Sequence, residues 1–132
     1  MKTKWIALAL AALGTLTAGF AAERKSKATK DFMRDKLELS QRVLEGIALE
    51  DFDLIIAKSK KLSAMSQAAN WQVFDNPDYA KHSAEFTRNV EALTRAAENK
   101  NLDGVTLAYF RVTMSCVECH RYVKGKMVAS RE

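Results

Sequence analysis

The segment Cys116-Val117-Glu118-Cys119-His120 lies near the C-terminus and holds both cysteines of the chain. Its Cys-x-x-Cys-His pattern is typical of covalent attachment of a c-type haem. The thiols stand about one helical turn apart, so each can add to a haem vinyl group, and the imidazole that follows can bind the iron. We therefore predict one covalent haem c per chain, attached through Cys116 and Cys119, with His120 as an iron ligand.

Three other interpretations of the paired cysteines stay open. A redox dithiol of thioredoxin type normally begins a helix that follows a strand, but residues 102–115 have no strand–turn signature. A structural zinc site needs four ligands, and His82 is not at zinc-finger spacing from the motif. A disulfide within one helical turn would have strained geometry. The haem interpretation is favoured over all three.

The N-terminus has the pattern of a secretory signal peptide. Met1-Lys2-Thr3-Lys4 is basic, the following residues up to Phe20 are mostly apolar, and small residues precede a cleavage site after Ala21. We expect a signal peptide over residues 1–21 and one periplasmic domain over 22–132; the alternative is an uncleaved anchor in the membrane. Haem is attached to bacterial cytochromes c on that side of the membrane, so the two motifs support each other.

Composition favours an all-helical domain without a nucleic-acid partner. The chain has a single proline, five glycines and many Ala, Leu, Lys and Glu residues, which are good helix formers. Its formal charge of +5 is not gathered into basic runs interleaved with aromatic residues, as nucleic-acid binding would require. About 110 residues after cleavage are enough for one core.

Apolar residues recur at three- and four-residue steps, which predicts amphipathic helices. We expect them over residues 29–49, 51–70, 77–99 and from 101 onward. Asp51, Asn76 and Asn101 are the predicted N-caps, and Pro77 takes the first helical position. Because the connections are short, the predicted fold is all-α, an antiparallel up-down four-helix bundle with the haem in its core.

Two of the predicted inward faces bear on the haem. The first helix is expected to turn inward Phe32, Met33, Leu37, Ser40, Val43, Leu44 and Ile47. The last is expected to turn inward Leu102, Val105, Ala108, Tyr109, Val112, Cys116 and Cys119. His120 follows one turn after Cys116, on nearly the same face.

A bundle with one haem motif on its last helix resembles the class II cytochromes c, the cytochrome c′ family. Three further segments are similar to that family: Lys60-Lys61-Leu62-Ser63-Ala64, Trp71-Gln72-Val73-Phe74 and Asn101-Leu102-Asp103. The chain departs from the family at the haem edge, where Tyr122 is two residues after the histidine and Val123 three after. Lys124 keeps the family's basic position.

The resemblance implies a haem with His120 as proximal ligand and the first helix over its distal face. Met33 lies near the position of the methionine ligand of the low-spin branch, and Leu37 follows one turn later on the distal face. A thioether ligand stabilises ferrous iron, so Met33 predicts a periplasmic one-electron carrier that serves redox partner proteins. Met33 as a simple packing residue stays open, and His82 is a weaker candidate for the sixth ligand.

The alternative function is a five-coordinate cytochrome c′ that binds small gases such as NO or CO under Leu37. Either protein is expected not to be an enzyme, because no distal His–Arg pair for peroxide cleavage is evident. We expect no nucleic-acid partner and no membrane span once the signal is removed. Whether the chain forms a homodimer stays open.

Overall fold

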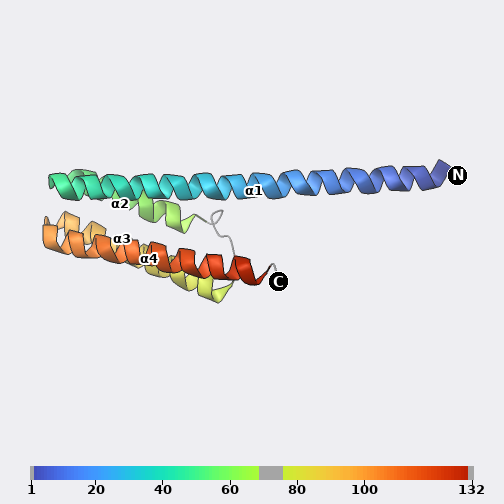
Figure 1. Cartoon of the computed structure of the whole chain (residues 1–132). Coiled ribbons are helices and arrows are strands. Elements are labelled where there is room, and N and C mark those ends of the chain that lie inside the picture. The colour runs from blue at the N-terminus through green and yellow to red at the C-terminus, as the bar shows by residue number, and fades with distance from the viewer. Residues whose placement is uncertain (1, 69–75, 131–132) are drawn as a thin grey trace. The chain divides into compact units, whose positions relative to one another are not determined.

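Four α-helices account for almost all of the chain that the structure describes (Figure 1). The computed structural model describes residues 2–68 and 76–130, with side chains from residue 23 onward. The helices are α1 (Lys2–Leu49), α2 (Phe52–Gln67), α3 (Pro77–Glu98) and α4 (Leu102–Ala129). Successive helices run antiparallel, and no strand occurs among the described residues. The predicted all-α up-down bundle is therefore confirmed.

Helix α1 starts much earlier than predicted, at Lys2 rather than near Thr29. Residues rich in Ala and Leu have high helix propensity, and no proline interrupts the chain before Thr29, so nothing forces a helix start there. The chain divides into a unit of Met1–Arg34, which is helical over its described part, and a unit of Asp35–Glu132, which holds the bundle. No helix over the described residues is long and apolar enough to cross a membrane.

The predicted helix starts are confirmed by their capping hydrogen bonds. The Oδ1 atoms of Asp51, Asn76 and Asn101 each accept a hydrogen bond of 2.9 Å from the backbone N–H three residues later. Each cap satisfies one backbone donor that the first turn of a helix leaves without a partner. Helix α2 ends at Gln67 rather than near residue 70. The predicted apolar loop with Trp71, Val73 and Phe74 lies outside the described residues.

The core of the bundle is an apolar cluster to which all four helices contribute. Its buried members are Leu39, Val43, Ile55, Leu62, Phe86, Val90, Leu93, Ala97, Val105, Ala108 and Val112. For α4 the predicted inward face is correct, since Val105, Ala108 and Val112 are buried and Tyr109 and Cys116 pack against the cluster. Burying apolar surface at about 25 cal/mol per Å² is the main term that holds such a bundle together.

For α1 the predicted inward face is wrong at two positions. Leu37 and Leu44 are 59% and 50% exposed, whereas Leu39, which was not predicted to face inward, is buried. Val43 is buried as predicted, and Ile47 packs against the core. Two apolar stripes run along this helix at similar spacing, and packing against the other helices selects the one that contains Leu39. The inward face is thus rotated from the predicted one, and this rotation changes which α1 residue lies near the cysteines.

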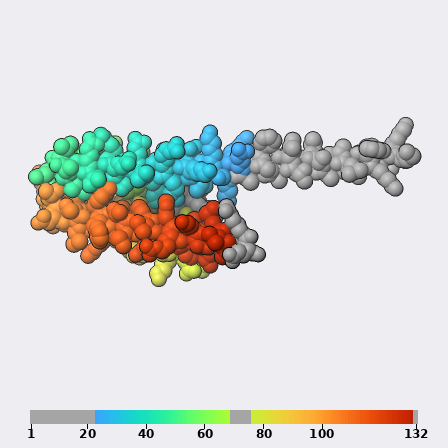
Figure 2. Space-filling model, viewed as in Figure 1, coloured from blue at the N-terminus to red at the C-terminus, as the bar shows by residue number. Residues whose placement is uncertain are grey.

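Polar contacts between helices hold α1 against α4. The Tyr109 hydroxyl on α4 donates to the Ser40 carbonyl oxygen on α1 at 3.2 Å. In Figure 2, the part of α1 from Asp35 onward and α4 form adjoining bands on the face in view. Within the Asp35–Glu132 unit, α1 and α4, the helix that bears the cysteine motif, therefore lie side by side.

Candidate haem-binding site

Helix α4 positions the cysteine motif in its second half, well away from either end. Cys116 and Cys119 are both half-buried, and Cys116 packs against the apolar core. His120 is exposed. The two thiols therefore lie on the flank of α4 that borders the core, with the imidazole on the adjoining flank.

Burial controls the protonation of the two thiols. It raises the pKa of Cys116 and the pKa of Cys119 above the ordinary range, although the Lys36 ammonium opposes the effect at each. Catalytic dithiols have lowered pKa values and lie at a helix N-terminus, and this pair has neither property. The geometry thus disfavours the redox-dithiol interpretation.

The residues present fit a covalently attached haem. Both cysteines are free thiols, as addition to two vinyl groups requires. They lie at the edge of an apolar core, where a porphyrin would bury its ring, and the imidazole that adjoins them is of the kind that binds haem iron. The donor set and its surroundings match the haem chemistry expected from the sequence.

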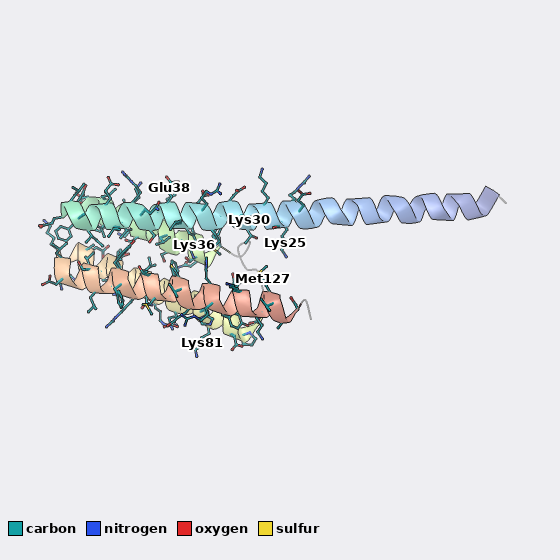
Figure 3. All side chains as sticks on the ribbon, in the orientation of Figure 1. Lys25, Lys30, Lys36, Glu38, Lys81 and Met127 are labelled. Atoms are coloured by element: carbon teal, nitrogen blue, oxygen red, sulfur yellow. The ribbon has the colours of Figure 1, made fainter. Side chains whose placement is uncertain are left out.

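Lys36 of α1 is half-buried among the helices of the bundle, and sequence reasoning missed it. Its Nζ atom lies 3.8 Å from the centroid of the Phe86 ring of α3. Its charge interacts with Cys116 and Cys119 of α4, and burial lowers the pKa of Lys36 to about 8. Figure 3 shows Lys36 on the side of α1 that faces α4, while Glu38 points the opposite way. The three-residue step from Lys36 to Leu39 places it on the buried stripe, a signal that a search limited to apolar residues overlooks.

The other predicted site residues occupy different surroundings. Met33 is half-buried and belongs to the Met1–Arg34 unit, and its role as an iron ligand stays a prediction. Leu37 is largely exposed, and a role on the distal face also stays a prediction. Lys124 is exposed on α4, and its role at the haem edge stays a prediction.

A second polar group ties α4 to the start of α3. The Tyr122 hydroxyl donates to the Oδ1 atom of Asn76 at 2.9 Å, and the Tyr122 ring lies 5.2 Å from that of His82. Among the described residues, His82, Glu85 and Glu118 have ligand atoms within 4.8 Å of one another. His82 of α3 thus lies beside Tyr122, Glu85 and Glu118. Tyr122 connects the part of α4 after the motif to Asn76, the N-cap of α3.

The Cys-x-x-Cys-His motif lies on α4, the last helix of the bundle. A model of the cytochrome c′ family matches residues 11–123. The chain belongs to the cytochrome c′ family. Members of this family bind haem c covalently, so haem c is the cofactor of this chain as well.

Solved structures show the same fold at low sequence identity. A nitric oxide complex of a point variant of cytochrome c prime from Alcaligenes xylosoxidans has a TM-score of 0.60 and 20% identity, over 75% of this chain and 92% of that one. A structure described as cytochrome c′ has a TM-score of 0.61 and 19% identity, over 76% and 94%. A second nitric oxide complex from A. xylosoxidans has a TM-score of 0.61 and 20% identity, over 75% and 91%. We found no match among curated protein sequences.

Proposed function

We propose that this cytochrome c′ binds small diatomic gases, nitric oxide first among them. In this proposal Cys116 and Cys119 attach the haem, His120 is its proximal ligand, and the sixth position stays open for the gas. The haem iron supplies the coordination site, and the protein supplies attachment, burial and access. The chain is then a binding protein without a catalytic turnover of its own.

The family match over residues 11–123 is the observation that carries this proposal. Solved cytochromes c prime of the same fold hold nitric oxide, which favours the gas-binding alternative over the electron carrier. The electron-carrier interpretation depends on Met33 as the sixth ligand of the iron. None of the comparisons supports ligation by His120 together with Met33. A methionine that only packs is the commoner situation.

Each residue of the site has a defined part in the proposed function. The two thioether bonds would fix the haem against the core side of α4, where Cys116 already packs. His120 would hold the iron from the α4 side. The stripe of α1 with Leu39 and Val43, both buried, would close the core beside the haem and exclude water. An apolar, enclosed haem favours neutral diatomic ligands over bulk water.

The test is an optical titration of the haem-loaded protein with CO, together with Met33→Ala. We expect the reduced protein to take up CO at once. We expect Met33→Ala to leave the ferric spectrum unchanged and to change the CO affinity by no more than about twofold. Met114→Ala is the matched control, because Met114 is an exposed methionine of α4.

The opposite result would restore the electron-carrier function. In that case the wild-type protein resists CO, shows the weak long-wavelength ferric band of a thioether ligand, and gains CO binding in Met33→Ala alone. A colourless protein from a host that matures cytochromes c would remove the haem assignment altogether.

We further infer that the chain is exported. The basic start, the apolar stretch, and the small residues Gly19 and Ala21 at a cleavage site after Ala21 support a signal peptide over residues 1–21 and a periplasmic domain over 22–132. Mass spectrometry of the haem-loaded protein checks the cleavage site. Redox partner proteins and a homodimer remain part of the proposal, and sedimentation of the same sample measures the second.

A further inference from the structure

Three metal-ligating side chains from two helices converge beside the cysteine motif. His82 and Glu85 lie about one turn apart on α3, and Glu118 of α4 stands between the two cysteines in the sequence. One ligand atom of each side chain, an imidazole nitrogen or a carboxylate oxygen, lies within 4.8 Å of the other two. Ligand atoms around a tetrahedral zinc ion lie about 3.3 Å apart, so small side-chain rotations bring these three to coordination distance.

Two hydrogen bonds fix the spacing of α3 and α4 on either side of this cluster. Near the start of α3, the Tyr122 hydroxyl donates to Asn76 Oδ1 at 2.9 Å. Further along α3, Asn89 Nδ2 donates to Ser115 Oγ at 2.7 Å. Along both helices the cluster lies between these two contacts. Ligands held in place before an ion arrives lose little conformational entropy when it binds.

The surroundings orient His82 and leave both carboxylates available. The Tyr122 ring lies 5.2 Å from the imidazole at an interplanar angle of 43°, and this contact limits rotation of the imidazole. No salt bridge within the described part of the chain includes Glu85 or Glu118. An open recess of about 580 Å³, lined in part by His82, Glu118 and Tyr122, gives an ion access from solvent. Two like charges held this close are stabilised by a cation between them.

The mixture of ligand atoms selects a transition-metal ion over Ca²⁺ or Mg²⁺. Zn²⁺ bonds to imidazole nitrogen as well as to carboxylate oxygen, whereas Ca²⁺ and Mg²⁺ prefer oxygen alone. Arg121 and Lys126 line the same recess, and their positive charges oppose any cation that is held by charge alone. A direct bond to the His82 nitrogen offsets this repulsion for Zn²⁺ and is not formed by the harder ions.

We propose that His82, Glu85 and Glu118 bind one divalent transition-metal ion, with water completing its coordination. The ion would join α3 to α4 at a site separate from the haem iron, and it does not depend on whether that iron binds gas. The chain has two histidines, and His120 is assigned to the haem. In the haem-loaded protein His82 is therefore the histidine that remains for a second metal.

The test is a calorimetric titration of the haem-loaded protein, without a polyhistidine tag, with Zn²⁺. We expect one ion per chain, and we expect His82→Gln, Glu85→Gln and Glu118→Gln each to weaken binding by about 10-fold or more. Glu91→Gln is the matched control, since it removes an exposed carboxylate of α3, and it should change the affinity by less than about twofold. Zn²⁺ should also raise the thermal unfolding midpoint of the wild type and not that of Glu118→Gln.

X-ray absorption at the zinc edge identifies the ligands in the wild type, so the inference stays testable even if a variant does not fold. We expect nitrogen and oxygen ligands at about 2.0–2.2 Å and no sulfur at about 2.3 Å. A zinc–sulfur distance, no saturable binding up to about 100 μM Zn²⁺, or undiminished binding in His82→Gln or Glu118→Gln would overturn the inference. Haem content and far-UV circular dichroism check that the variants fold. None of these results bears on CO binding, which tests the proposed function separately.

Discussion

Helices α1 and α4 both pack into the apolar core, yet of the two only α4 has the inward face that its sequence predicts. On α4 the apolar stripe with Val105, Ala108 and Val112 leads directly to Cys116, and all of these residues are buried or pack against the core. A second apolar stripe on the same helix, with Leu107, Phe110 and Met114, is exposed. On α1 the apolar residues form two stripes, and the one with Leu37 faces solvent. Each of the two helices thus has a second apolar stripe, and packing against the other helices decides which stripe turns inward.

The largest expected effect tests the orientation of α1. Leu39→Ala should lower the free energy of unfolding of the haem-loaded protein by about 2–4 kcal/mol, because it opens a cavity in the core. Leu37→Ala should lower it by less than about 0.5 kcal/mol, as is usual for exposed positions. Both values come from guanidinium unfolding followed by circular dichroism.

The reverse order of these two effects would contradict the structure. It would mean that Leu37 covers the haem, as the sequence predicts, and that Leu39 faces solvent in the loaded protein. Leu44→Ala is the matched control, since Leu44 is exposed two turns after Leu37 on the same side of α1. It should behave as Leu37→Ala does.

This contrast also explains how much of the molecule could be predicted. The helix caps Asp51, Asn76 and Asn101 are local features, since each bonds to an N–H three residues away, and so the bundle could be predicted from sequence. The cysteine motif is equally local. Lys36 could not be placed, because its contact with Phe86 joins residues 36 and 86 of different helices and depends on the rotation of α1. Tertiary packing decides such contacts, and the spacing of apolar residues along the sequence does not predict it.

A smaller effect concerns the pH dependence that Lys36 gives to the haem-free chain. Burial lowers its pKa from 10.5 to about 8, so between these pH values the unfolded chain binds more protons than the folded one. The free energy of unfolding should therefore rise as pH increases from about 8 to 10.5, by at most about 3 kcal/mol, and the contribution of Lys36 should be lowest below pH 8.

The two thiols act in the opposite direction and must be removed first. Burial raises the pKa values of Cys116 and Cys119, so the folded chain keeps protons that the unfolded chain releases, and their contribution falls as pH rises. We therefore propose the measurement in a Cys116→Ser/Cys119→Ser background. Adding Lys36→Met should abolish the rise with pH and increase stability at pH 7. A rise that persists in that variant would show that another group causes it.

The smallest expected effect compares the turns at the end of α1 and the start of α4. In each turn a residue other than glycine adopts a left-handed conformation, with φ of 54° at Glu50 and 53° at Lys100. Each N–H bonds to the carbonyl three residues back, at 3.2 Å for Glu50 and 2.9 Å for Lys100, and the next N–H bonds to the carbonyl five back. The two turns are thus the same Schellman motif, in which glycine is the preferred residue.

Because the motifs match, Glu50→Gly and Lys100→Gly should stabilise the protein equally, by about 1 kcal/mol each. The sites are at different turns and share no partner, so the double variant should gain the sum. Guanidinium unfolding midpoints at constant slope measure the gain. A gain at Lys100 alone would mean that the turn after α1 does not keep its left-handed residue in solution, and that the orientation of α1 rests on the core contacts of Leu39 and Val43 rather than on its connection to α2.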